Sequence, residues 1–191
     1  PLTFMAGGSA AAFEKAKAVL DAMGKKVVHC GDAGAGQAAK ICNNMILGAT
    51  MVATCEAFKL AERLGLDLQT FYDISSKASG QSWSMTSYCP VPGVGPQSPA
   101  DNQYQGGFAT ALMLKDLKLA MEAAQTAGSD TPMGQRAREL YEAFDAAGNH
   151  SARVEHTVTV AGPTGGDVSR AEFDLLKAQV AKIDQWIRNY D

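Results

Sequence analysis

The sequence predicts a mainly α-helical fold around one long central helix, preceded by a short β segment. Residues 37–64 contain no proline and little turn chemistry, which is typical of an uninterrupted helix. Apolar residues recur at helical spacing in 9–23 and again in 108–126. Four of the seven prolines fall within residues 89–107, which indicates a long loop. At about 1.5 Å per residue, the central helix would be about 42 Å long.

Two short strands flank a helix before the central helix begins. Residues 2–5 and 25–30 are short runs with the apolar and β-branched content of strands. The helix predicted at 9–23 ends at Gly24, a residue type suited to a helix C-terminus. A strand at the very start of a chain is typical of the end of a larger sheet, so we expect this segment to be the remnant of one.

The glycines that lead into the central helix have two interpretations. Gly34-x-Gly36-x-x-Ala39 matches a dinucleotide-binding fingerprint, which also requires an acidic residue at the end of a second strand about 20 residues on. Glu56 has that spacing but lies inside the central helix, and no strand follows nearby. We therefore predict no parallel sheet around this loop. The glycines are better interpreted as a tight entry to a closely packed helix.

The central helix is apolar on nearly every face between residues 41 and 60. A helix with that composition is buried in the folded protein. In a chain of 191 residues, its burial calls for a partner subunit or a second domain. We therefore expect the chain to form a homo-oligomer through residues 37–64.

Turn signals separate the segments that follow Gly65. Asp67 can cap a helix that runs to about Lys77. Residues 79–84 form a polar turn that contains glycine. The loop at 89–107 is longer than most loops in compact domains, and loops of that length are often functional.

Two helices complete this region. The first is predicted over residues 108–126. The second begins at Thr131-Pro132, which places a hydroxyl at the N-cap and a proline at the first helical position, and it ends at Gly148.

Residues 150–191 form a tail of different character. Alternation over 154–160 predicts a strand, and Ser169-x-x-Glu172 is a capping box. The apolar residues behind the box are three and four positions apart, which predicts one amphipathic helix over residues 169–190. This helix packs on its own domain or a symmetry mate, or it docks on a different protein partner.

Composition excludes several classes of function. The net charge is −3 and the basic residues do not cluster, which argues against nucleic acid and membrane surfaces as partners. No apolar run reaches the roughly 18 residues that a membrane span requires. The four cysteines lack CxxC or zinc-type spacing, which favours free thiols in a reducing compartment. The three histidines form no metal-binding pair, so no metal site is predicted.

Tight packing of the glycine entry does not explain Lys40. The positive end of an apolar helix is an unfavourable place for an ammonium group, and such an environment suits an acid–base lysine. Asn44 lies four residues further on and shares the same face. That face offers a proton carrier and an amide able to hold a hydroxyl or a carboxylate. A solvated surface lysine is the alternative.

Four stretches resemble the β-hydroxyacid dehydrogenase family, which includes the 3-hydroxyisobutyrate dehydrogenases. GAGQAAKICNN (34–44) resembles the family's G-x-G-x-x-x-K-x-x-x-N signature. PLTFMAGG (1–8) is similar to the last strand of its nucleotide domain, and SSKASGQSW (75–83) to the turn that lines its substrate pocket. GGFATALMLKDLKLA (106–120) resembles the segment that reaches the nicotinamide. The resemblance covers residues 2–149 in the family's order.

The resemblance implies a division of the chain and a fold. Residues 1–33 would be the end of a nucleotide-binding domain, with remnant strands and a helix. Residues 34–149 would form the 6-phosphogluconate-dehydrogenase-like C-terminal helical domain around a long central helix, which binds substrate and dimerises. No counterpart of residues 150–191 is recognised in the family.

The resemblance also implies roles for single residues. Lys40 would transfer a proton to or from the substrate hydroxyl while a hydride moves to NAD or NADP. Asn44 would orient the substrate, and Lys115 and Phe108 would contact the cofactor. The implied substrate is 3-hydroxyisobutyrate or a similar 3-hydroxy acid, oxidised to the semialdehyde, and the implied location is the cytoplasm or the mitochondrial matrix.

Two departures from the family pattern bear on function. Gly80 lies in the substrate-pocket turn, but Gln81 stands where related sequences often carry a second glycine. No nucleotide-binding domain precedes the matched motifs, so NAD or NADP would bind only with such a domain present. We expect the chain to be inactive alone and to need a chain that supplies this domain. The alternative is a non-catalytic interaction or structural subunit derived from such an enzyme.

Overall fold

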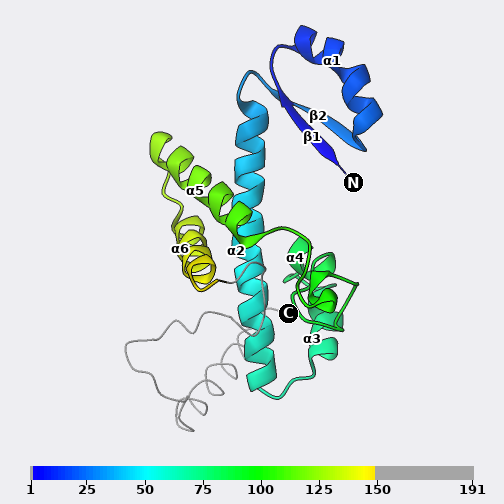
Figure 1. The fold of residues 1–191 in the computed structure, drawn as a ribbon, viewed down its shortest axis with the longest axis vertical. Coiled ribbons are helices and arrows are strands. Elements are labelled where there is room, and N and C mark those ends of the chain that lie inside the picture. Colours follow the sequence, from blue (N-terminus) through cyan, green and yellow to red (C-terminus); the bar gives the residue numbers. More distant parts are fainter. Residues whose placement is uncertain (1, 149–191) are drawn as a thin grey trace, which may run out of the picture. The chain divides into compact units, whose positions relative to one another are not determined.

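The computed structural model describes residues 2–148, which fold into helices with one small sheet (Figure 1). The elements are β1 (Thr3–Gly7), α1 (Ala10–Met23), β2 (Lys26–Gly31), α2 (Ala35–Arg63), α3 (Leu68–Ser75), α4 (Trp83–Thr86), the 3₁₀ turn η1 (Pro99–Asn102), α5 (Thr110–Thr126) and α6 (Pro132–Ala146). This order confirms the mainly α fold around a long central helix. The strand, turn and helix predicted within residues 150–191 lie outside the described residues.

The two strands pair in parallel, with α1 as the connection between them. Met5 lies opposite Val28 in the register. Parallel neighbours need a crossover of this kind, because a tight hairpin joins only antiparallel strands. The Ser9 side chain accepts a hydrogen bond from the Ala12 N–H at 3.3 Å and so caps α1. The prediction that no parallel sheet forms around the glycine loop is therefore wrong. That prediction considered only strands after the loop, whereas both paired strands lie before it in the sequence.

The glycine entry is a close contact between α2 and the backbone of β1. Gly34 caps α2 in the left-handed region, with φ of 92°, which favours glycine. A Cβ at Gly36 would collide with the carbonyl of Met5, and one at Gly7 would lie 2.7 Å from the Asp32 oxygen. The chain itself therefore fills the space beside Gly36. This contact supports the interpretation of the motif as a tight helix entry.

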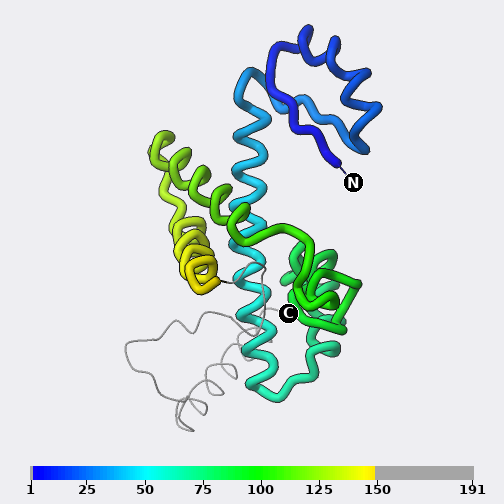
Figure 2. Tube along the Cα trace, in the orientation of Figure 1, coloured from blue at the N-terminus to red at the C-terminus, as the bar shows by residue number. Residues whose placement is uncertain are grey.

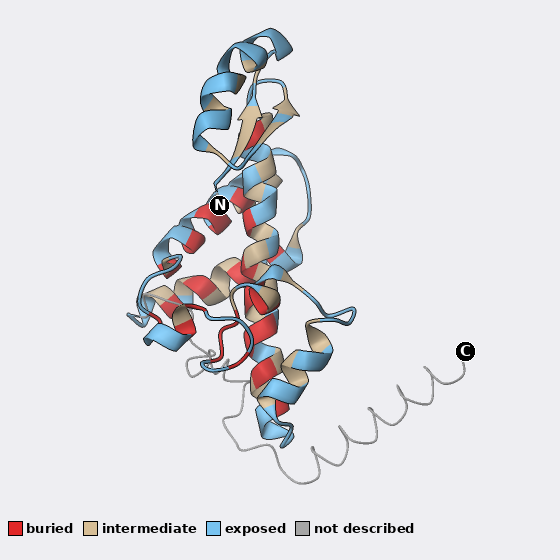
Figure 3. Cartoon of the chain, turned by 90° about the vertical axis from the view of Figure 1, so that its right-hand side faces the viewer, coloured by how far each residue is buried: buried red, intermediate tan, exposed pale blue. Residues whose placement is uncertain are grey.

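Helix α2 runs for 29 residues and packs against α3, α4, α5, α6 and both strands. Figure 2 shows its long, continuous trace through the described residues. Its buried residues are Gly36, Asn44, Gly48, Met51, Thr54, Cys55, Phe58 and Ala61. The rest of the helix is less buried than predicted, since Ile46 and Leu60 are 62% and 50% exposed (Figure 3). Within residues 2–148, α2 alone has the length and composition to cross a membrane, a criterion that core helices of soluble proteins also meet.

Two apolar clusters attach the other helices to α2. The first joins Phe58 to the region around α4 and is completed by Met85, Cys89, Val91 and Val94, with α3 packed against it. The second lies where α5 and α6 meet α2, and its centre is the fully buried Leu117. The side chain of Leu117 packs against Gly48, whose absent side chain lets α5 approach α2 closely.

The loop at 89–107 is more ordered than its prolines suggested. It contains η1, which begins with a capping box between Ser98 and Asp101. Asp101 also accepts a hydrogen bond from the Gly93 N–H at 2.7 Å. The Ser98 hydroxyl donates to the Cys89 carbonyl at 2.7 Å. Side-chain hydrogen bonds to the backbone therefore replace regular structure in this segment, a feature that apolar periodicity does not reveal.

The two predicted N-caps differ in whether the side chain makes a capping hydrogen bond. Asp67 caps α3 as predicted, accepting from the Thr70 N–H at 2.8 Å. Thr131 occupies the N-cap of α6 but makes no capping hydrogen bond. Its hydroxyl lies 3.8 Å from the Met121 sulfur on α5 instead. The predicted helix start, with Thr131 at the N-cap and Pro132 in the first turn, is confirmed, but the hydroxyl does not cap the helix because it contacts α5 instead.

Two glycine substitutions in α2 separate backbone from side-chain contacts. Gly36→Ala should reduce the free energy of unfolding by about 1–3 kcal/mol, because the new methyl group meets the β1 backbone, which cannot move aside. Gly48→Ala should change it by less than about 1 kcal/mol, because the Leu117 methyl groups can shift and alanine favours helix by about 0.5–1 kcal/mol. Urea unfolding of both variants checks this, and equal losses would contradict it.

Candidate active site

Lys40 and Asn44 lie on one face of α2, as predicted, and α5 crosses that face. Their neighbour on α5 is Asp116, which the sequence reasoning missed. The Asn44 amide donates to Asp116 Oδ2 at 2.6 Å, and the Lys40 ammonium lies 3.4 Å from the same oxygen. Lys115 reaches the other carboxylate oxygen at 3.0 Å. We call these four residues the Asp116 cluster.

Burial differs sharply within the Asp116 cluster. The side chain of Asp116 is 6% exposed, whereas those of Lys40 and Lys115 are each 57% exposed. Asn44 is buried. The cluster therefore places two ammonium groups at the surface, above a buried carboxylate and amide. The apolar, desolvated surroundings expected for Lys40 are not what the structure shows, because the lysine borders solvent and a carboxylate.

The pKa of Asp116 reflects this arrangement. Burial alone would raise the pKa of its carboxyl group. The hydrogen bonds from Lys115 and Asn44, together with the charges of Lys40 and Lys115, outweigh burial and hold the pKa below its ordinary value. Asp116 is therefore a fixed negative charge at neutral pH. It orients its partners and does not act as the proton carrier.

The sequence contains a signal that could have identified Asp116: it is a charged residue at a position of α5 where the apolar spacing predicts a buried side chain. The buried positions of α5 include Met113, Leu117 and Ala120, three or four residues apart. Asp116 falls on that face, three residues after Met113 and four before Ala120. A charged residue on a buried helix face is rarely placed there without a partner.

The remaining predicted residues lie in the segments that lead to α4 and α5. Gly80 and Gln81 are exposed in the turn between α3 and α4. Phe108 is 39% exposed, and its N–H donates to the Tyr88 hydroxyl at 2.7 Å. Within residues 2–148, no hydrogen bond or ion pair joins these three residues to the Asp116 cluster. The structure thus brings together Lys40, Asn44 and Lys115 but does not join Gly80, Gln81 or Phe108 to them.

A buried hydroxyl pair fixes the predicted substrate turn to α2. Ser84, at the start of α4, is fully buried and lies 3.1 Å from the Thr50 hydroxyl. Thr50 is ten residues beyond Lys40, which corresponds to about 15 Å along the helix axis. Two further hydroxyl groups, those of Ser82 and Thr110, are buried without a partner in the described structure. They stand at the beginnings of α4 and α5.

The described residues fit part of a dinucleotide. The exposed ammonium of Lys115 and the partly exposed ring of Phe108 have the charge and shape to meet a phosphate or ribose and a nicotinamide ring. The loop at Gly34–Gly36 does not offer a cradle for a pyrophosphate, because the β1 backbone fills the space beside Gly36. Residues 2–148 hold no group of three metal-ligating side chains.

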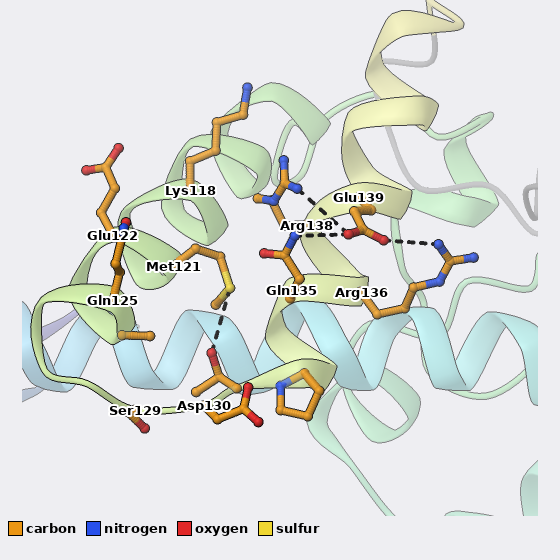
Figure 4. A pocket seen from close by; sticks show the side chains of 13 residues that line it. Lys118, Met121, Glu122, Gln125, Ser129, Asp130, Gln135, Arg136, Arg138 and Glu139 are labelled. Atoms are coloured by element: carbon orange, nitrogen blue, oxygen red, sulfur yellow. Dashed lines mark hydrogen bonds and ion pairs between the residues drawn. The ribbon is translucent and has the colours of Figure 1, made fainter.

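A groove of about 820 Å³ lies elsewhere, between the end of α5 and the start of α6 (Figure 4). The charged side chains that α6 contributes to it are paired: Glu139 lies 3.2 Å from Arg136, and Arg138 reaches Glu142 at 2.7 Å. None of the predicted functional residues lines it. These ion pairs join neighbouring turns of α6, so their role is structural.

Comparison with known proteins places these observations in a family. Residues 34–161 match the family described as "NAD-binding of NADP-dependent 3-hydroxyisobutyrate dehydrogenase". Residues 1–31 match the "NAD binding domain of 6-phosphogluconate dehydrogenase". A probable 3-hydroxyisobutyrate dehydrogenase of Mycobacterium bovis is 47% identical over 159 residues, which are 82% of this chain and 54% of that protein.

Two more relatives agree. The mitochondrial 3-hydroxyisobutyrate dehydrogenase of Drosophila melanogaster is 48% identical over 143 residues, 75% of this chain and 44% of that protein. The solved structure of the Mycobacterium tuberculosis 3-hydroxyisobutyrate dehydrogenase with L-serine superposes with a TM-score of 0.77 at 45% identity, covering 84% of this chain and 55% of that one. This chain thus spans about half the length of the relatives it matches. The chain belongs to the 3-hydroxyisobutyrate dehydrogenase family.

Proposed function

We propose that this chain is the substrate-binding and dimerisation part of an NAD(P)-dependent dehydrogenase that oxidises 3-hydroxyisobutyrate or a similar 3-hydroxy acid. The Asp116 cluster carries this proposal. Its two lysines and one aspartate leave a net charge of +1 at the surface beside a buried amide. A 3-hydroxy acid carries one negative charge and one hydroxyl group, which match that set. Family membership supports NAD(P) use.

Lys40 is the residue that moves the substrate proton. Its ammonium is exposed and forms an ion pair with the buried Asp116 carboxylate. In its neutral form the amine would accept the proton of the substrate hydroxyl as the carbon–oxygen bond becomes a carbonyl. Bound NAD(P) would supply the acceptor for the hydride. The hydrogen bond to Asp116 orients the Asn44 amide, which would then be a preorganised hydrogen-bonding group for the substrate.

The range of substrates within the 3-hydroxy acids follows from the same set of contacts. Lys40 and Asn44 act on the hydroxyl and the carboxylate, groups that every 3-hydroxy acid shares. The solved relative was studied with L-serine, which carries an amino group next to the carboxylate. We therefore propose that the exposed turn at Gly80 and Gln81, rather than the Asp116 cluster, contacts the substituent on the carbon next to the substrate carboxylate and so selects among 3-hydroxy acids. We propose a location in the cytoplasm or the mitochondrial matrix, and the name of the Drosophila relative includes the word mitochondrial.

The alternative is a non-catalytic interaction subunit. It is favoured by the glycine entry, which the β1 backbone closes, so that residues 2–148 offer no complete dinucleotide site of their own. The two functions differ in whether a dinucleotide-binding half joins this chain, in the same polypeptide or in a complex. Copurification of the chain with such a half, together with NAD(P) binding by the assembly, decides between them.

Self-association is proposed through the exposed face of α2. Ile46, Ala53 and Leu60 are exposed and seven residues apart, so they form one stripe along the helix. The small side chain at the centre of the stripe allows another helix to approach closely. A second copy of the chain presents the same stripe and is therefore complementary to it.

Lys40→Ala tests the acid–base role. In the assembly that includes a dinucleotide-binding half, kcat should fall about 10²-fold or more, the usual scale for general acid–base catalysis. Binding of the cofactor should be little changed. Lys118→Ala is the matched control, because Lys118 is an exposed lysine on α5 paired with Glu142 at 2.9 Å. Near-normal turnover of 3-hydroxy acids by Lys40→Ala would refute the role.

Asp116→Asn tests the buried charge through pH. The folded pKa of Asp116 is lowered, so its stabilisation is fully present above the unfolded value of about 3.9 and is lost as pH falls through the folded pKa. The variant should therefore be less stable than the wild type at neutral pH, and its stability should fall less between pH 5 and acid. Thermal unfolding across that range measures both, and parallel curves for the two proteins would show that the charge is not stabilising.

Ile46→Glu tests the proposed dimer. A charge within the apolar stripe should shift the protein toward the monomer in sedimentation at micromolar concentration. Val19→Glu is the matched control, because Val19 on α1 is exposed to the same 62% and lies outside the α2 stripe. A monomeric wild type, or equal dissociation by both variants, would contradict an interface on α2.

A further inference from the structure

The side chain of Tyr88 connects the α4 region with the entry to α5. Its ring stacks on Trp83, with centroids 5.2 Å apart and planes 23° from parallel. Its hydroxyl accepts a hydrogen bond from the Phe108 N–H at 2.7 Å. Trp83 follows the exposed turn that holds Gly80 and Gln81. One residue therefore touches both segments that the family resemblance assigns to substrate and cofactor.

The backbone before Phe108 is shaped around that hydroxyl. Gly106 and Gly107 have φ of 84° and 76°, in the region that favours glycine. A Cβ at Gly107 would collide with the Tyr88 hydroxyl and would lie 2.7 Å from Pro99 Cγ. The two glycines thus let the chain pass close over the tyrosine, so that the next N–H meets its oxygen.

Helix α5 has no side-chain cap of its own. Its N-cap is Ala109, which carries no side-chain acceptor, and the hydroxyl of the following Thr110 is buried without a partner. The Tyr88 hydroxyl is thus the side-chain acceptor that anchors the backbone at this entry. Lys115 and Asp116 lie within two turns of the same helix start, about 8–10 Å further along its axis.

We propose that Tyr88 is a positioning residue, whose hydroxyl holds Phe108 and the start of α5 in register with the turn before α4. This inference rests on the proposed function and on the family resemblance, which implies that Phe108 contacts the cofactor. A reactive distance that is wrong by about 1 Å can cost up to 10²-fold in rate. The Phe108 N–H lies at the surface and can bond water when the hydroxyl is removed, so the loss affects position more than stability.

Tyr88→Phe removes the hydroxyl and keeps the stacked ring. Tyr104→Phe is the matched control, because Tyr104 donates its buried hydroxyl to the Pro90 carbonyl at 3.1 Å in the same loop but does not contact the Phe108 N–H through it. In the 191-residue chain, Tyr88→Phe should speed hydrogen exchange of the Phe108 amide by about tenfold, and Tyr104→Phe should leave it within about twofold.

Kinetics separate positioning from a structural role. In the assembly with a dinucleotide-binding half, Tyr88→Phe should lower kcat about tenfold while KM for the 3-hydroxy acid stays within about threefold. The deuterium isotope effect on kcat, with substrate labelled at the carbinol carbon, should rise because hydride transfer becomes more nearly rate-limiting. Tyr104→Phe should leave all three quantities within about twofold.

The outcomes that overturn the inference are distinct from failure of the proposed function. An active parent protein in which Tyr88→Phe matches the wild type, in amide exchange or in kcat, overturns the positioning role. Equal losses in Tyr88→Phe and Tyr104→Phe also overturn it, because they indicate general loosening of the loop. A parent assembly that binds NAD(P) but oxidises no 3-hydroxy acid overturns the proposed function and the catalytic part of this inference with it.

Discussion

Close approach to α2 is the constraint on which the rest of the described structure depends. Two glycines on α2 permit it: Gly36 lets the helix meet the backbone of β1, and Gly48 lets it meet Leu117 on α5. A side chain at Gly36 would meet the β1 backbone, which cannot move aside, whereas a methyl group at Gly48 would meet only the Leu117 side chain, which can shift. The spacing between α2 and α5 in turn brings side chains from two distant parts of the sequence within hydrogen-bond distance.

The Asp116 cluster depends on that spacing and shows how charge is managed there. A carboxylate that is 6% exposed is costly to ionise unless it is paired and hydrogen-bonded. Two lysines and an amide meet this requirement. The same contacts that stabilise the buried charge therefore preorganise the groups that would act on a substrate.

The surface of α2 that faces away from these contacts accounts for the remaining apolar character of the helix. Neither α4 nor α5 covers the exposed stripe of α2: Ile46 is 62% exposed and Leu60 is 50% exposed. One helix thus serves as the packing centre of the described residues and as the carrier of Lys40 and Asn44.

The sequence by itself determined the local features: the extent of α2, the shared face of Lys40 and Asn44, the Asp67 cap and the family. These depend on spacing of three or four residues, or on short motifs, which a linear sequence displays directly. Only the tertiary structure decided that Asp116 meets Lys40, that Tyr88 meets Phe108 and that Thr131 turns to Met121 rather than capping α6. Lys40 and Asp116 are 76 residues apart, and their contact follows from where and at what angle two helices cross. Periodicity shows which face of a helix is apolar but not which residues of another helix will lie against it.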